Sequence, residues 1–141
     1  MVQKRELEIL KQLRKNSRKN MVDISRETAI PLSTVFDKLY AIEETYIKKF
    51  VALVDFSKLG YNLKTLVTVK AKKPEELKGF LKEHKNVNSV FRLKGECDFL
   101  IEGIFSSIKQ MDSFIDKLRE FSKEIKLYHV IDELMKEGFM G

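Results

Sequence analysis

The sequence predicts an α+β fold of two small domains: three N-terminal helices, then a β linker and a C-terminal βαββαβ unit. Apolar residues recur at helical spacing until about residue 45, and short β-prone segments follow from residue 50. A strand–helix–strand pattern then occurs twice. The chain has 141 residues, enough for two small cores. We therefore expect domains at residues 1–49 and 63–141, joined by a β-strand linker or hinge at 50–62.

The first domain contains three helical segments separated by short breaks. Residues 5–15 place leucines on one face, and residues 22–28 form a second short helix. Pro31 suits the first position of a third helix, which runs to about residue 45. Its expected buried stripe is Val35, Leu39 and Ile42. The short turn before this helix gives the spacing of a helix-turn-helix, a motif that binds DNA.

Positive charge is concentrated in the same domain. The net charge is +6, and residues 1–50 hold eleven Lys or Arg against seven Asp or Glu. The densest cluster is Lys11, Arg14, Lys15, Arg18 and Lys19. Such a cluster attracts phosphates through Coulomb attraction and counterion release, although an ordinary solvated helix face has the same composition. Taken alone, the cluster is better explained as a solvated face; together with the helix-turn-helix spacing, it favours double-stranded DNA as the partner.

The second domain has the ferredoxin-like order of elements. Strands are expected at 63–71, 87–94, 99–105 and 126–132, with helices beginning at Pro74 and Ser107. Two helices cover only one face of a four-stranded sheet. The residues predicted for the other face are Leu66, Thr68, Val90, Arg92 and Leu100. The simplest partner for such a face is a second copy of the chain.

Several classes of function find no support in the sequence. No apolar run approaches the roughly 18 residues of a membrane span, and no signal peptide is evident. The single Cys97 fits a reducing compartment, so we expect a cytoplasmic protein. No catalytic motif or metal-ligand spacing is present, so we expect neither an enzyme nor a cofactor. The Lys and Glu content predicts an archaeal or thermophilic source.

Four groups of residues carry a family resemblance over nearly the whole chain: Leu7-Glu8-Ile9-Leu10, Ser33-Thr34-Val35, Lys58-Leu59-Gly60-Tyr61 and Gly95-Glu96-Cys97-Asp98. In their order and spacing they resemble the leucine-responsive regulatory protein / asparagine-synthase regulator (Lrp/AsnC) family. The resemblance implies a DNA-binding transcription regulator whose linker strand pairs between subunits. It also implies homodimers that assemble into octamers, with a small effector, typically an amino acid, bound between dimers.

The predicted DNA-binding residues are Arg18, Lys19, Ser33, Thr34, Asp37 and Lys38. Thr34 and Lys38 lie one turn apart on the third helix, where base-edge and phosphate contacts are expected. The sequence departs from the family at Phe36 and Asp37, which stand where basic residues are usual. Asp37 repels phosphate but can accept a hydrogen bond from cytosine. The alternative is therefore a relative that does not bind DNA and acts as a ligand sensor or partner subunit.

The resemblance places the effector near Gly95 and Asp98, with His129, Val130 and Ile131 of the last strand. A carboxylate such as Asp98 can pair with the ammonium group of an amino acid. An Asp after a Gly is equally well explained as a turn residue that accepts backbone N–H groups. Both interpretations of Asp98 remain open at this point.

Overall fold

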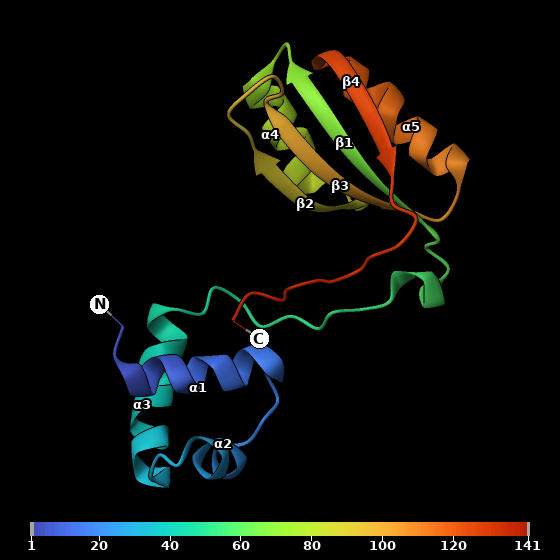
Figure 1. Cartoon of the computed structure of the whole chain (residues 1–141). Coiled ribbons are helices and arrows are strands. Elements are labelled where there is room, and N and C mark those ends of the chain that lie inside the picture. Colours follow the sequence, from blue (N-terminus) through green and yellow to red (C-terminus); the bar gives the residue numbers. More distant parts are fainter. Residues whose placement is uncertain (1, 141) are drawn as a thin grey trace. The chain divides into compact units, whose positions relative to one another are not determined.

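The computed structural model describes residues 2–140, which divide into two compact units (Figure 1). We call residues 2–53 together with 134–140 the helical unit, and Val54–Glu133 the sheet unit. Each is described by itself. The division differs from the expected one because the last residues of the chain belong to the helical unit.

The helical unit contains the three expected helices, α1 (Lys4–Lys15), α2 (Met21–Thr28) and α3 (Leu32–Thr45). Asn20 caps α2, since its side-chain oxygen accepts a hydrogen bond from the Asp23 N–H at 2.9 Å. Ala29 ends α2 in the left-handed conformation, with φ of 56°. This turn brings α3 across α2, and the helices enclose one apolar core: Ile9, Leu13, Ile24, Ile30, Val35 and Ile42.

The C-terminal tail contacts α1 of the same unit. The Arg14 guanidinium donates to the carbonyl oxygens of Glu137 and Phe139 at 3.0 and 3.1 Å, and forms an ion pair with the Glu137 carboxylate at 3.3 Å. Tail residues 134–139 have exposed side chains and no helix or strand. Arg14, one of the predicted basic cluster, therefore holds the tail.

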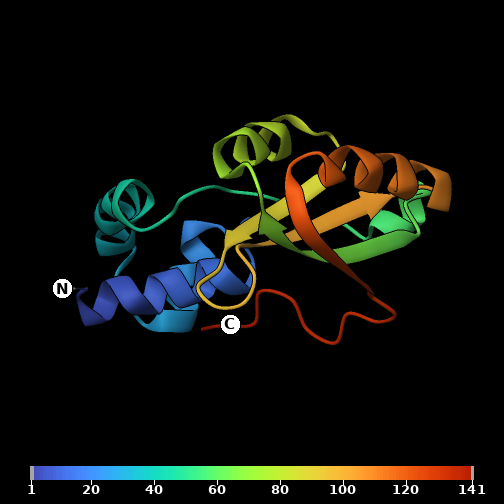
Figure 2. The ribbon, with the colours of Figure 1, turned by 90° about the horizontal axis from the view of Figure 1, so that it is seen from above.

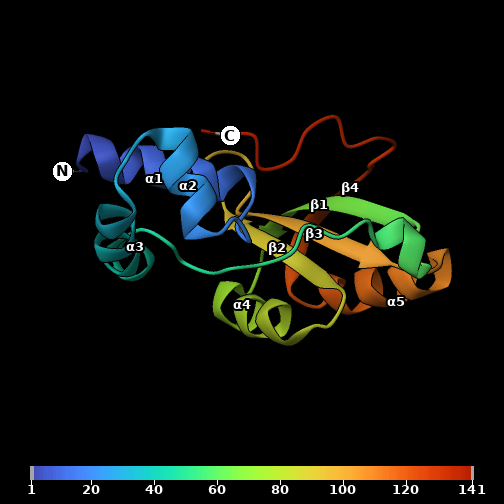
Figure 3. The same ribbon diagram turned by 90° about the horizontal axis from the view of Figure 1, so that it is seen from below.

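The sheet unit has the predicted βαββαβ order. Its elements are β1 (Leu63–Ala71), α4 (Pro74–Glu83), β2 (Val87–Arg92), β3 (Phe99–Phe105), α5 (Ile108–Arg119) and β4 (Ser122–His129). The antiparallel sheet has the order β2-β3-β1-β4 (Figure 1). Both helices cover the same face, as Figure 2 and Figure 3 show from opposite sides. The core between the helices and this face includes Val67, Val69, Leu77, Ile101, Phe105, Phe114 and Leu118.

The strand register confirms part of the predicted uncovered face and corrects the rest. Leu66, Thr68 and Leu100 alternate with core residues and lie on the uncovered face. Val90 and Arg92 pair with Ile101 and Phe99, two core residues, so their prediction was wrong. A register shift between Val87 and Ser89 causes the difference, and Phe91, opposite Leu100, takes the uncovered side.

The last strand also begins and ends earlier than predicted, at Ser122–His129 rather than 126–132. Val130 and Ile131 therefore follow the strand.

The predicted linker strand has no strand partner in the described single chain. Residues 50–54 carry no regular structure, and a short 3-10 helix, η1 (Phe56–Leu59), follows them. Gly60 ends η1 with φ of 90°, a conformation that favours glycine. The apolar side chains of Phe50, Val51 and Leu53 are exposed.

Candidate functional site

The outer face of α3 is set by the residues that α3 buries. Val35 and Ile42 are fully buried, which turns Ser33, Phe36 and Asp37 outward into solvent. Thr34 and Lys38 are half-buried and flank this face. The Lys38 ammonium donates to the Gln3 side-chain oxygen at 2.6 Å. The predicted residues Ser33 and Asp37 thus occupy the centre of the outer face, with Phe36 between them.

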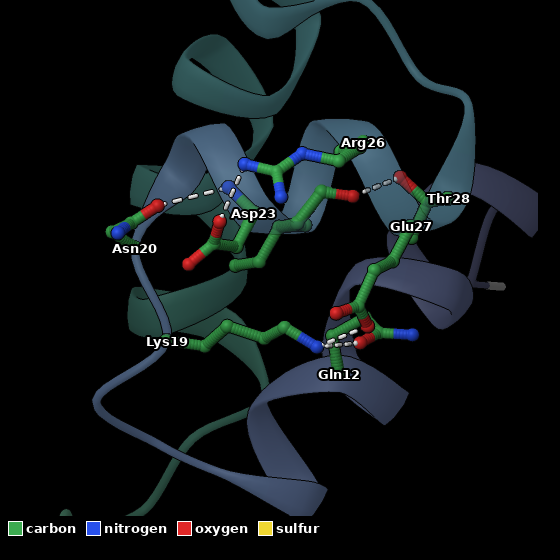
Figure 4. Close-up of polar contacts among 8 residues, drawn as sticks. Gln12, Lys19, Asn20, Asp23, Arg26, Glu27 and Thr28 are labelled. Atoms are coloured by element: carbon green, nitrogen blue, oxygen red, sulfur yellow. Dashed lines mark hydrogen bonds and ion pairs between the residues drawn. The ribbon is translucent and has the colours of Figure 1, made fainter.

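Lys19 is engaged within the helical unit. Its half-buried ammonium donates to the Gln12 side-chain oxygen at 2.6 Å and pairs with the Glu27 carboxylate (Figure 4). This hydrogen bond from Lys19 is the main reason that the pKa of Glu27 lies below its ordinary value. Lys19 therefore ties the loop before α2 to both α1 and α2.

Arg18 is the member of the predicted pair that remains available to an external anion. Its side chain is exposed and makes no hydrogen bond or ion pair within residues 2–140. Its backbone N–H donates to the Asn16 side-chain oxygen at 3.0 Å, which fixes the loop that carries it. A phosphate contact by Arg18 therefore stays a prediction.

Asp98 supports the loop between β2 and β3. One carboxylate oxygen accepts from the Ala71 N–H at 2.7 Å, and the Asp98 N–H donates to the Val69 carbonyl at 2.8 Å. Asp98 is half-buried, whereas Gly95, with φ of 150°, is exposed. These bonds agree with the interpretation of Asp98 as a turn residue. They leave the other carboxylate oxygen for a further partner, because a carboxylate accepts several hydrogen bonds.

The remaining effector candidates lie at the other end of β1. His129 pairs with Thr65, whose hydroxyl lies 3.1 Å from the His129 Nδ1. Val130 donates its N–H to the Lys64 carbonyl at 2.9 Å, and Ile131 is fully exposed. Six residues of strand, about 20 Å, separate Thr65 from the Ala71 that Asp98 contacts. One chain therefore does not bring the two groups of predicted residues together.

The sheet unit contains a pocket that the sequence did not predict. It has a volume of about 320 Å³ and is lined by η1, Tyr61, the residues that begin β2, Ile104 and Gln110. None of the predicted effector residues lines it. Phe56 and Tyr61, two of its walls, lie in a segment whose pattern indicates only a connector, so no sequence signal identified the pocket.

Among the residues that the structure describes, no group of three or more His, Cys, Asp or Glu side chains is arranged to hold a metal ion. In the same part of the chain, no helix is long and apolar enough to cross a membrane.

Comparison with known proteins agrees with this organisation. A family model described as the Lrp/AsnC ligand binding domain matches residues 65–138. An uncharacterised HTH-type transcriptional regulator of Pyrococcus horikoshii is 26% identical over 135 residues, covering 93% of this chain and 91% of that protein.

Solved structures share the fold over nearly the full chain. A transcriptional regulator of Neisseria meningitidis, solved as an L-Met complex, has a TM-score of 0.89 at 23% identity, covering 96% of this chain and 94% of that one. LrpC of B. subtilis has a TM-score of 0.88 at 21% identity, covering 96% and 98%.

Proposed function

The chain belongs to the Lrp/AsnC family of transcription regulators, and from this premise we propose that it binds double-stranded DNA through α3 under the control of a small effector. Family members are regulators rather than enzymes. Some residues of this chain would contact DNA, and others would bind the effector.

One observation carries the DNA-binding part of the proposal. After the left-handed turn at Ala29, the outer face of α3 exposes Ser33, Phe36 and Asp37, and the first turns of α2 and α3 line one groove. The exposed Arg18 precedes α2 in the chain. A recognition helix works in this way, since it reads base edges while flanking residues hold the phosphates. The positive excess in residues 1–50 supports the same partner.

Fluorescence anisotropy with a labelled duplex from the region upstream of the chain's own gene tests this proposal. Arg18→Ala should weaken binding about tenfold and reduce the slope of log affinity against log salt by about one per subunit. Lys123→Ala, which removes an exposed cation of the sheet unit, is the matched control and should change neither. Failure to bind any duplex, specific or not, would favour the alternative of a sensor that does not bind DNA.

For the effector we propose an amino acid, bound where Asp98 of one copy lies near His129 of another. Two observations support this proposal. Asp98 and His129 contact opposite ends of β1 in one chain, so only two copies can bring them together, and the N. meningitidis regulator was solved with L-Met. The free carboxylate oxygen of Asp98 would accept from the ammonium group, and backbone N–H groups of the loop would donate to the carboxylate.

Self-association follows from the uncovered face of the sheet. Leu66 and Leu100 are half-buried there, Phe91 and Tyr128 are exposed, and the buried Thr68 hydroxyl has no hydrogen-bond partner in the described residues. We propose that a second copy covers this face to give a dimer, and that dimers assemble into octamers. Light scattering of the full chain, with and without each of the twenty amino acids, tests both the assembly and its dependence on an effector.

A further inference from the structure

The outer face of α3 is apolar where a DNA-reading helix commonly carries cations, and this feature deepens the proposed function on which it rests. Leu32, Phe36 and Tyr40 follow one another at four-residue spacing and are 47%, 64% and 68% exposed. Residues four apart share one face of a helix, so the three side chains form a continuous row. We call it the apolar row of α3.

An open groove adjoins the row at the start of α3. It has a volume of about 500 Å³ and lies between the first turns of α2 and α3, lined mainly by Met21, Val22, Leu32 and Phe36. Val22 is 55% exposed. The first turns of these two helices are the part of a helix-turn-helix that enters or borders the major groove. Apolar surface is therefore concentrated at the end of α3 that reaches base edges.

The chemistry of the bases selects one partner for this surface. Arginine and lysine side chains read guanine in the major groove, but the outer face of α3 has no Arg, and its flanking Lys38 is bonded to Gln3. The C5-methyl group of thymine is the apolar group that bases present in this groove, and a Phe side chain contacts it favourably. Asp37, beside Phe36, repels phosphates, so this part of the face suits base edges better than the backbone.

We propose that Phe36 reads the C5-methyl group of thymine, so that the chain distinguishes thymine from other bases by an apolar contact instead of an arginine–guanine pair. Burying one methyl group contributes enough free energy to change the dissociation constant about fourfold. The effect repeats at each half-site that a dimer contacts.

Uracil provides the test, because it pairs as thymine does but lacks the methyl group. The full chain first selects duplexes from a pool with a 20-bp random segment, and thymines of the best duplex are then replaced by uracil one at a time. We expect enrichment of thymine in the pool and about fourfold weaker binding at one or two positions per half-site. Phe36→Ala should weaken binding to the thymine duplex about fourfold, as the uracil replacement does for the parent chain. This variant should then bind the thymine and uracil duplexes with the same affinity.

Two further variants make the result specific. Phe36→Leu retains an apolar side chain and should keep part of the thymine preference. Ile108→Ala shortens a side chain of the sheet unit that is 67% exposed, and it should leave binding unchanged. Circular dichroism establishes that each variant is folded.

The outcomes separate this inference from the function on which it rests. Tight binding that ignores every uracil replacement would overturn the methyl contact while leaving DNA binding by α3 intact. A pool that yields no selected sequence would overturn sequence-specific binding itself. If Phe36→Ala changes the assembly seen by light scattering, the apolar row is a protein interface and the inference is wrong.

Discussion

The helical unit groups its candidate functional residues together, whereas the sheet unit holds its candidates apart. In the helical unit, Ser33, Phe36 and Asp37 lie on one face of one helix, with Arg18 close before α2. In the sheet unit, Asp98 and His129 contact opposite ends of β1. A single chain thus holds all the residues proposed to contact DNA on one unit, whereas it keeps the two groups of residues proposed for the effector apart.

This difference assigns the two proposed functions to different levels of assembly. Base contacts need only a folded helical unit, although a dimer adds a second half-site. A ligand held by Asp98 and His129 needs two chains, so it stabilises whichever assembly brings them together. Measurements of DNA binding, effector response and stability test whether the two proposed sites differ in this way.

The largest expected effect is the salt dependence of DNA binding. With six or more phosphate contacts per dimer, raising the salt from 50 to 200 mM should weaken binding by about 10³-fold. Anisotropy titrations over this range measure the effect. An affinity that changes less than about tenfold would show that cations such as Arg18 make few contacts.

The second prediction tests whether the effector site spans two chains. Asp98→Asn keeps an acceptor for the Ala71 N–H but removes the charge, and His129→Gln removes the imidazole. Each variant alone should lose the rise in melting temperature caused by the most effective amino acid. A refolded equimolar mixture should recover about a quarter of the sites, because mixed dimers carry one intact site in two.

Two other results would contradict that arrangement. No recovery in the mixture would mean that no site combines Asp98 of one chain with His129 of another. A full response in both single variants would point to another site, for which the pocket beside Phe56 and Tyr61 is the first candidate.

The third prediction concerns the turn that orients α3. Ala29 has φ of 56°, which costs an L-residue about 1–2 kcal/mol, whereas glycine adopts it freely. Ala29→Gly should therefore stabilise the helical unit by about 0.5–1 kcal/mol after the greater entropy loss of glycine. Ala41→Gly, in the interior of α3, should destabilise by about 1 kcal/mol. Urea denaturation checks both signs, and equal signs would contradict the strain at Ala29.

The smallest expected effect is the pH dependence of the sheet unit. Burial of the imidazole, which lies 4.8 Å from the Phe114 ring centre, lowers the pKa of His84, and Lys117 and Lys85 add repulsion. The unfolded chain therefore takes up a proton before the folded one does. The free energy of unfolding should fall as the pH drops below about 6.5, and level off below the folded pKa.

Urea denaturation between pH 8 and pH 5 measures this fall. His84→Gln should reduce it. The same fall in His84→Gln as in the parent would assign the pH dependence to other groups.

The sequence predicted the inner strands better than the edge strands, for a physical reason. β1 and β3 agree with the expected 63–71 and 99–105, because β1 buries alternate residues and β3 buries nearly all of its residues, and their apolar residues show it. β4 is an edge strand whose residues are mostly exposed, so Ser122, Lys123 and Glu124 resemble a loop. At β2 the register shift after Val87 reverses the faces, and alternation alone does not reveal such a shift.

The candidate site was predictable to the extent that it depends on local spacing. The position of α3 and the exposure of Asp37 followed from the helical period. The hydrogen bond from Ala71 to Asp98 and the tie of Lys19 to Gln12 and Glu27 join residues from different elements, and no local pattern indicates them. The predicted buried stripe of Val35, Leu39 and Ile42 leaves Leu32, Phe36 and Tyr40 on another face of α3, but their exposed apolar row was not predicted as a functional surface.

The hydrogen bonds from Arg14 to the C-terminal tail affect the topology of the chain. The helical unit is discontinuous, since residues 2–53 and 134–140 both belong to it, and Val54–Glu133 is in effect a domain inserted between them. An inserted domain is connected to its host by two covalent crossings instead of one, which restricts the rotations open to each. Arg14 stabilises the second crossing through its hydrogen bonds to Glu137 and Phe139, so removing this guanidinium would weaken the contact of the tail with α1.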